Sequence, residues 1–197
     1  MVRIGVLISG GGTNLQAVID GCENKSINGE VKVVISNKAD AFGLERAKNH
    51  SIKAVCEKEE DKIIEILKEN KIDLVVLAGY LKIISPKLVN EYRNRIINIH
   101  PSLIPAFCGE GYYGQKVHQS VIDYGTKVTG ATVHFVDEGA DTGPIIMQKT
   151  VEVKQDDNAK KLAARVLDVE HEILTKSIAM FCENKLTVQG RRVYIND

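Results

Sequence analysis

Apolar, strand-like runs and helix-like stretches alternate along the first hundred residues of the chain. Residues 2–8 are mostly apolar or β-branched and stop at a glycine-rich segment, residues 9–14. Helical spacing follows at Leu15, Val18, Ile19 and Cys22, and a second strand-like run at residues 30–35. Because a fully apolar strand must be covered on both faces, this feature predicts an α/β fold. We expect a three-layer, open, mostly parallel twisted sheet with helices on both faces.

The same alternation continues toward residue 100. Apolar spacing predicts further helices around residues 42–47 and 63–67, and further strands at residues 52–56, 74–77 and 95–99. Ser85 and Pro86 predict a helix start, because serine caps a helix and proline suits its first turn.

The C-terminal half departs from strict alternation. After a helix at residues 117–124, two strands are expected at residues 129–136 and 144–153, as an antiparallel addition to the sheet. Apolar residues then recur with the period of one amphipathic helix between residues 158 and 181. A terminal hairpin is expected from residue 186 onward.

Composition limits the class of protein. The 197 residues are 44% hydrophobic, which suits one sizeable core and predicts a single domain over residues 1–197. Basic and acidic side chains number 26 each, which argues against a nucleic-acid surface. No apolar run reaches the roughly 18 residues of a membrane span and no secretory signal is recognised, so we expect a cytoplasmic protein. The cysteines are scattered, which predicts reduced thiols and no metal site.

The glycine-rich segment, residues 9–14, lies between a predicted strand and a predicted helix. Glycines permit positive φ angles, and free N–H groups there meet the positive end of the helix dipole, so an anion fits. The segment lacks the lysine of a P-loop, and Leu15 stands where a dinucleotide fingerprint needs its third glycine. A single phosphate therefore remains, bound by the loop together with the side chains of Thr13 and Asn14. A tight turn without a ligand is the alternative.

Asn98 and His100 are two residues apart at the end of a predicted strand, so their side chains share one face. That end is the edge at which open α/β sheets bind ligands. Asp141 follows in a loop rich in glycine and aspartate that can reach the same edge. An amide, an imidazole and a carboxylate together can stabilise an oxyanion and move a proton, with Asp141 raising the pKa of His100. Structural roles at a strand end and in a turn are the alternatives.

Other polar residues are interpreted singly. His134 lies in an apolar strand and is expected to be an inward, hydrogen-bonded histidine that supports the site. Glu170 lies on the apolar stripe of the long helix, which is unfavourable for a carboxylate unless it is solvated at the edge or binds an amine. His50 and His118 are expected at the surface.

Four segments together resemble the phosphoribosylglycinamide formyltransferases, also called glycinamide ribonucleotide transformylases, a family of folate-dependent formyltransferases. The segments are residues 8–16, 36–41, 98–103 and 134–144, so the resemblance runs over nearly the whole chain. It implies a Rossmann-like formyltransferase fold in one domain. Residues 1–100 would be the phosphate-binding half, and residues 101–197 the folate and catalytic-loop half with the long C-terminal helix.

The resemblance also implies a reaction. The formyl group of 10-formyltetrahydrofolate, the co-substrate, would pass to the amino group of glycinamide ribonucleotide, giving formylglycinamide ribonucleotide and tetrahydrofolate in de novo purine (IMP) synthesis. No metal is implied. The implied partners are these small molecules, with no nucleic acid and no membrane, and a homodimer stays open.

Residue roles follow from the same resemblance. The catalytic set would be Asn98, His100 and Asp141, with His134 behind it. The ribonucleotide would be bound by Gly11, Gly12, Thr13, Asn14 and Glu170. The folate would lie against Leu81, Lys82, Ile83, Ile84, Asn98, Asp137, Glu138, Gly139 and Ala140.

Three departures from the family pattern stand out. Residues 57–61 are shorter than in many members, where a basic residue meets the folate tail, and Lys82 stands where the family often has arginine. The loop at residues 108–114 is longer than usual. Two other functions stay open: a formyltetrahydrofolate hydrolase, and a nucleotide-phosphate-binding α/β module without catalysis.

Overall fold

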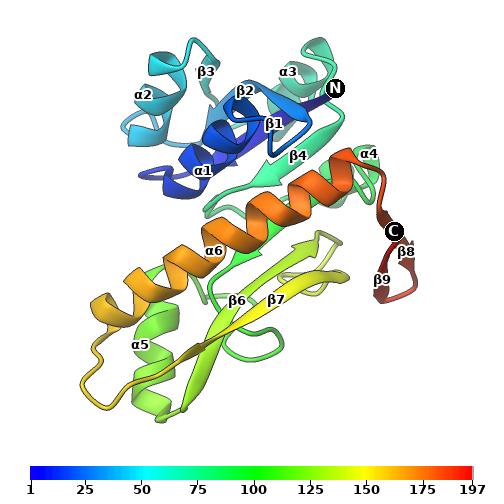
Figure 1. Ribbon diagram of the computed structural model, residues 1–197. Helices are drawn as coiled ribbons and strands as arrows, with labels where there is room; N and C mark the ends of the chain where they lie inside the picture. The colour runs from blue at the N-terminus through cyan, green and yellow to red at the C-terminus, as the bar shows by residue number, and fades with distance from the viewer. Residues whose placement is uncertain (197) are drawn as a thin grey trace.

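The computed structural model describes residues 1–196, which form one nine-stranded sheet and its covering helices (Figure 1). The strands are β1 (Val2–Ile8), β2 (Gly29–Ser36), β3 (Lys53–Cys56), β4 (Leu74–Leu77), β5 (Ile96–His100), β6 (Val128–Phe135), β7 (Ile145–Glu152), β8 (Leu186–Gln189) and β9 (Arg192–Ile195). The helices are α1 (Thr13–Glu23), α2 (Phe42–Asn49), α3 (Glu60–Glu69), α4 (Pro86–Glu91), α5 (Gln115–Tyr124) and α6 (Ala159–Cys182).

The strand order in the sheet is β3-β2-β1-β4-β5-β6-β7-β9-β8. The neighbouring strands among β1 to β5 are parallel to one another. Strand β6 pairs antiparallel with β5, and β7 pairs antiparallel with β6. The predicted parallel sheet with an antiparallel addition is therefore confirmed. The chain moves from β1 to one side through β2 and β3, and then returns to the other side through β4 and β5. Ligands of open α/β sheets bind where the order reverses in this way, here between β1 and β4.

Two hydrophobic clusters cover the two faces of the sheet. Alternation along β1 sends Ile4, Val6 and Ile8 to one cluster and Leu7 to the other. The first cluster contains the buried faces of α1, α2, α5 and α6, and the second those of α3 and α4. The sequence runs are apolar on both faces of the strand because both faces are covered.

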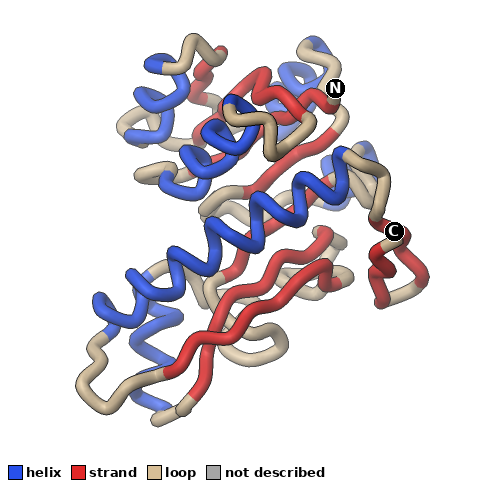
Figure 2. Tube along the Cα trace, viewed as in Figure 1, coloured by secondary structure: helices blue, strands red, loops and turns tan. Residues whose placement is uncertain are grey.

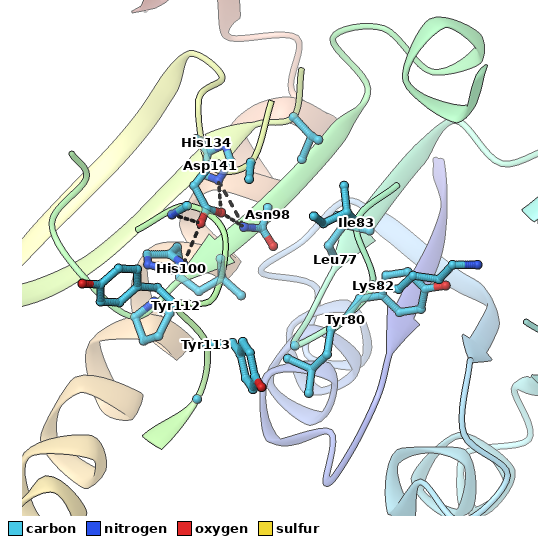
Figure 3. A pocket seen from close by; sticks show the side chains of 18 of the residues that line it. Leu77, Tyr80, Lys82, Ile83, Asn98, His100, Tyr112, Tyr113, His134 and Asp141 are labelled. Atoms are coloured by element: carbon cyan, nitrogen blue, oxygen red, sulfur yellow. Dashed lines mark hydrogen bonds and ion pairs between the residues drawn. The ribbon is translucent and has the colours of Figure 1, made fainter. Parts of the chain in front are cut away.

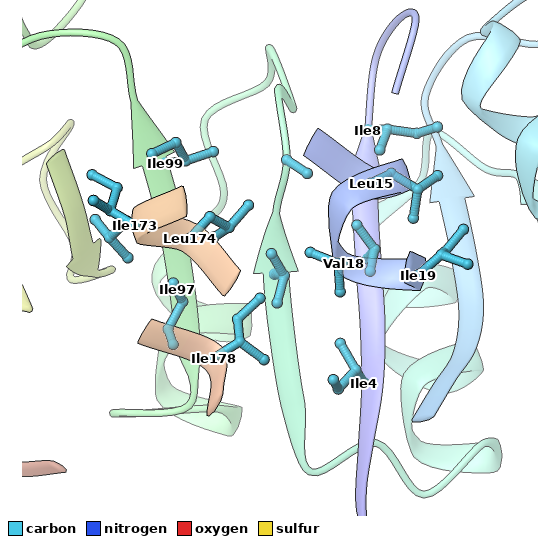
Figure 4. Packing of buried hydrophobic residues seen from close by; sticks show 14 of the residues in the cluster. Ile4, Ile8, Leu15, Val18, Ile19, Ile97, Ile99, Ile173, Leu174 and Ile178 are labelled. Carbon is cyan, nitrogen blue, oxygen red and sulfur yellow. The ribbon is translucent and has the colours of Figure 1, made fainter. Parts of the chain in front are cut away.

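Helix α6 crosses the first face of the sheet diagonally (Figures 1 and 2). It starts at Asn158, whose side chain accepts a hydrogen bond from the N–H of Lys161 at 2.9 Å. Its apolar stripe contacts strands β5, β6 and β7 and helices α1 and α5. Figure 4 shows Leu174 and Ile178 of α6 pointing toward the sheet beside Val18 of α1. The helix therefore joins the N-terminal and C-terminal parts of the sheet.

The element boundaries predicted from the sequence differ from the observed ones by only a few residues. Strand β5 extends one residue further than expected, so that His100 is its last residue. Phe42 begins α2 but is 57% exposed, beneath the guanidinium of Arg46. The terminal hairpin is present as β8 and β9, and only the pair Ile145 and Arg192 connects it to β7. None of the helices in residues 1–196 is both long and apolar enough to span a membrane.

Leu174 provides a test of the role of α6. It is fully buried in the cluster on the first face, so Leu174→Ala should lower the free energy of unfolding by about 2–5 kcal/mol. Urea denaturation measures the change. Lys160→Ala, an exposed position on the same helix, should change it by less than about 0.5 kcal/mol. Equal effects of the two substitutions would contradict the packing role.

Candidate active site

A cleft of about 480 Å³ opens where the strand order reverses. Its walls come from the chain just after β4 and β5, from the loop before α5, from the loop between β6 and β7, and from three helices. The lining includes residues 79–84, 98–101, 109–114 and 139–141, together with Asn14, His118, His134 and Glu170. The cavity therefore lies at the carboxyl ends of the parallel strands, where the sequence predicted a ligand.

Asn98 and His134 lie opposite each other in the antiparallel pairing of β5 and β6. The Asn98 amide nitrogen is 3.1 Å from Nε2 of His134. His134 is 1% exposed, and its Nδ1 lies 2.8 Å from the carbonyl oxygen of Phe135. A carbonyl only accepts, so Nδ1 carries a proton, and Nε2 can accept from the Asn98 amide. His134 is thus the inward, hydrogen-bonded histidine that the sequence predicted.

Asp141 lies between Asn98, His100 and His134 (Figure 3). Its carboxylate oxygens are 3.4 Å from the Asn98 amide nitrogen, 3.4 Å from Nδ1 of His100 and 3.6 Å from Nε2 of His134. The backbone N–H of Gly109 donates to the same carboxylate at 2.9 Å. Burial alone would raise the pKa of Asp141. The contacts with His134 and His100 and the Gly109 N–H outweigh burial, so its pKa lies below the usual range.

His100 is 4% exposed at the end of β5. Its Nε2 donates to the Phe107 carbonyl at 2.9 Å, and its Nδ1 faces Asp141. Burial lowers the pKa of His100, and the charge of Asp141 and the Phe107 carbonyl offset this only in part. The expectation that Asp141 raises the pKa of His100 above its ordinary value is therefore wrong, because the loss of hydration in the cleft is the larger effect.

The glycine loop leads from β1 into α1. Gly12 has a φ of 71° and caps α1, and added side chains at Gly10 or Gly11 would meet open space. Gly11, Gly12 and Thr13 do not line the cleft itself, whereas Asn14 does. The loop is thus next to the cleft, at the positive end of α1.

Asn14 and Glu170 meet although 156 residues separate them. The Asn14 amide donates to the Glu170 carboxylate at 2.8 Å. This contact directs the Asn14 side chain toward α6 and leaves its backbone N–H for an anion at the loop. Glu170 is 8% exposed, and burial raises its pKa to about 7 although the Asn14 hydrogen bond opposes the shift. Glu170 is thus neither solvated at the edge nor without a partner, because the Asn14 amide bonds to it.

The segment after β4 forms the mouth of the cleft. Leu81 and Ile83 are 51% and 64% exposed there, whereas Ile84 is buried. Lys82 extends its Nζ to the carbonyl oxygen of Lys58, at 2.9 Å, and so connects the mouth to the short segment at residues 57–61. Apolar side chains with exposed faces suit a flat, partly apolar ligand.

Only part of the loop between β6 and β7, which we expect to contact the folate, lines the cleft. Gly139 and Ala140 line the cleft, but Asp137 and Glu138 do not. The Asp137 side chain accepts hydrogen bonds from Thr142 and from the N–H of Gly139, which shape the loop. Glu138 forms an ion pair with Arg93 outside the cleft. The side chains of Asp137 and Glu138 therefore make contacts within the protein and do not point into the cleft.

Two histidines were expected at the surface, and the expectation is wrong for His118. His118 is 4% exposed on the inner face of α5 and lines the cleft, and its Nδ1 has no hydrogen-bond partner within residues 1–196. Burial lowers its pKa to about 4. Its helical spacing from the buried Val121 was the signal that sequence reasoning missed. His50 is half-buried and pairs with Glu23 at 2.7 Å.

Sequence reasoning also missed three tyrosines of the cleft. Tyr80 follows β4, and Tyr112 and Tyr113 belong to the long loop before α5. Figure 3 shows Tyr113 and Tyr80 at the same end of the cleft, on segments that precede and follow β5. Residues 109–114 of this loop therefore form part of the cleft wall.

Comparison with known proteins identifies the family to which the chain is similar. The formyl transferase family model matches residues 2–178. A phosphoribosylglycinamide formyltransferase of Haemophilus influenzae is 40% identical, over 100% of this chain and 94% of that protein. The chloroplastic phosphoribosylglycinamide formyltransferase of Vigna unguiculata is also 40% identical over 93% of this chain, but the chain spans only 62% of its length. The crystal structure of glycinamide ribonucleotide transformylase 1 from Symbiobacterium toebii matches with a TM-score of 0.94 and 44% identity, over 100% of this chain and 95% of that one.

His118 should make the fold sensitive to acid. Its pKa of about 4 in the folded chain lies below the ordinary 6.5, so its contribution to stability is full above pH 6.5 and is lost as the pH falls through 4. By pH 4.5 the loss should reach about 2–3 kcal/mol. Urea denaturation at pH 7 and pH 4.5 should show a smaller pH effect for His118→Gln than for the wild type. Gln119→Ala, at an exposed position on the same helix, is the control and should keep the wild-type pH dependence. An unchanged dependence in His118→Gln would contradict the assignment.

Proposed function

The chain belongs to the formyl transferase family, in the group of the phosphoribosylglycinamide formyltransferases, and from this premise we propose its reaction. The formyl group of 10-formyltetrahydrofolate passes to the amino group of glycinamide ribonucleotide, as a step of purine synthesis. The products are formylglycinamide ribonucleotide and tetrahydrofolate. The observation that carries the proposal is the convergence of Asn98, His100 and Asp141 in one cleft.

The first role of these residues is to bind the formyl oxygen. When the amine attacks the formyl carbon, negative charge develops on this oxygen, and preorganised N–H donors stabilise it. The contacts of Asn98 and His100 with Asp141, at 3.4 Å each, are longer than ordinary hydrogen bonds. The Asn98 contact is therefore one that a formyl oxygen can replace, and Nδ1 of His100 becomes a second donor when the ring is protonated. The shorter bonds of Asn98 to His134 and of His100 to Phe107 hold the two side chains in place.

The second role is proton transfer. A bond forms between the amine nitrogen and the formyl carbon, and the bond from that carbon to N10 of the folate breaks. The amine loses one proton and N10 gains one, so the reaction is balanced without an added acid or base. Asp141, whose pKa is lowered, is a carboxylate at neutral pH and can accept the amine proton directly or through water. The proton taken from the amine then passes from Asp141 to N10, either directly or through Nδ1 of His100, which lies 3.4 Å from the carboxylate.

Two binding regions flank this centre. The ribonucleotide phosphate is proposed to lie at Gly11, Gly12, Thr13 and Asn14, and its sugar toward Glu170. The folate is proposed to enter past Leu81, Lys82, Ile83 and Ile84, with its ring against residues 137–140. The partners are then two small molecules, which agrees with a formal net charge of zero. The proposed steps use side chains alone and take place in the cytoplasm.

One assay separates the proposal from its alternatives. The purified chain is incubated with 10-formyltetrahydrofolate, with and without glycinamide ribonucleotide. Formylglycinamide ribonucleotide formed only in the presence of both supports the transferase. Release of formate without ribonucleotide would indicate a hydrolase, and the absence of any reaction would indicate a binding module.

Asn98→Ala and His100→Ala should each lower kcat about 10²–10³-fold, because each removes one donor to the developing oxyanion. The KM values for both substrates should change little. Steady-state kinetics measure both effects. Asn90→Ala, at an exposed asparagine of α4, and His50→Ala are matched controls that should keep the wild-type kcat. A variant of Asn98 or His100 with full kcat would remove that residue from the mechanism.

Asp141→Asn tests the link between Asp141 and His100. In the wild type His100 should titrate below its ordinary pKa of 6.5, because burial dominates. The neutral amide removes the attraction for the imidazolium, so the pKa of His100 should fall further, and kcat should fall as well. NMR titration of the His100 ring and a pH–rate profile measure the two effects. Titration and rate curves that overlay those of the wild type would leave Asp141 as a residue of the turn.

A further inference from the structure

The carbonyl groups of the glycine loop face helix α2. The N–H of Gly43 donates to the carbonyl of Gly10 at 3.0 Å. The Nε of Arg46 donates to the carbonyl of Gly11 at 2.8 Å, across 35 residues of sequence. Two successive carbonyls of the loop are therefore bonded to the same helix.

This arrangement decides where the amides of the loop point. In a planar trans peptide, the carbonyl of one residue and the N–H of the next point in opposite directions. With the carbonyls of Gly10 and Gly11 bonded to α2, the N–H groups of Gly11 and Gly12 point away from it. Successive N–H groups beside a left-handed residue form an anion-binding concavity, and Gly12 has a φ of 71°. The bond from Arg46 thus fixes the side of the loop on which an anion binds.

Arg46 is itself held by two further contacts. Its NH1 donates to the Gln16 side chain at 3.2 Å, and its guanidinium lies 5.0 Å from the centre of the Phe42 ring. The remaining terminal nitrogen makes no hydrogen bond within residues 1–196. Residues 9–14 carry no charged side chain. Arg46 therefore brings a positive charge to a loop that has none.

A separate observation indicates a ligand next to the loop. Asn14 lines the cleft and is 8% exposed, and its Oδ1 is buried without a hydrogen-bond partner within the described residues. A buried acceptor left unpaired is costly. A ligand that extends from the loop into the cleft and carries a hydroxyl or N–H group can supply the missing donor. The phosphate end of such a ligand then lies at the loop.

We propose that Arg46 is a positioning residue for the substrate phosphate. It holds the Gly11 carbonyl toward α2, so that the N–H groups of Gly11 and Gly12 face the phosphate, and it adds the positive charge that the loop lacks. This inference rests on the proposed function, in which the substrate is a ribonucleotide. Helix α2 does not line the cleft, but its first turn packs closely against the loop. A Cβ atom on Gly12 would lie 2.8 Å from Cα of Gly43.

Arg46→Ala should raise the KM for glycinamide ribonucleotide at least about tenfold, as expected for loss of a charge-assisted contact. The KM for the folate and kcat should stay within about twofold of the wild type. Arg46→Lys keeps the charge but not the paired geometry, and its KM should fall between the two. Lys48→Ala is the matched control, because it removes one positive charge from the same helix, where Lys48 is exposed and pairs with Glu45. It should leave every constant unchanged. Gly12 is unsuitable for this test, since any side chain there is strained.

Ribose 5-phosphate provides a readout that does not need turnover. It should raise the thermal midpoint of the wild type and of Lys48→Ala, whereas ribose should not, and the rise should be lost in Arg46→Ala. Arg46→Ala with a wild-type KM and a wild-type response to ribose 5-phosphate would overturn the inference. A fall in kcat or in the thermal midpoint of Arg46→Ala, with both KM values unchanged, would also overturn the inference, because it would indicate a purely structural role. If the wild type transfers no formyl group, the proposed function fails, and the response to ribose 5-phosphate alone decides the role of Arg46.

Discussion

A buried carboxylate needs polar partners, and Asp141 obtains them from three separate parts of the chain. Asn98 donates from β5, the N–H of Gly109 donates from the loop before α5, and His134 of β6 lies 3.6 Å away. His100 adds a fourth polar contact. Asp141 adopts a left-handed backbone conformation with a φ of 57°, which is uncommon for a residue other than glycine. The loops around the cleft therefore converge on one negative charge, and the shape of the cleft depends on it.

Much of the fold was predictable because its elements are local patterns. Mostly apolar runs predicted β1 and β4 with their observed boundaries, and the serine–proline pair predicted the start of α4. Asn98 and His100 were recognisable because polar residues at the end of an apolar strand point to a ligand edge. Asp141 was recognisable because its loop connects strands at the same edge.

The remaining features of the site depend on packing between distant segments. The bond between Asn14 and Glu170 joins α1 to α6, and no local pattern contains both residues. Arg46 resembles any solvated arginine of a surface helix until α2 is placed against the glycine loop. The lowered pKa of His100 likewise required the depth of its burial, which sequence shows only as neighbouring apolar residues. The candidate residues of the site were thus easier to predict from the sequence than the contacts that surround them.

Helix α6 has a consequence for how the protein is made. It lies near the end of the chain, yet it packs against β5 and α1 and carries Glu170 to Asn14. During synthesis the strands β1 to β5 leave the ribosome well before α6 does, with the apolar face that α6 covers still exposed. The contact between Glu170 and Asn14 spans most of the chain and closes a long loop, which is entropically slow. The wall of the cleft that contains Asn14 and Glu170 is therefore one of the last parts of the molecule to form, and a chain without α6 lacks it.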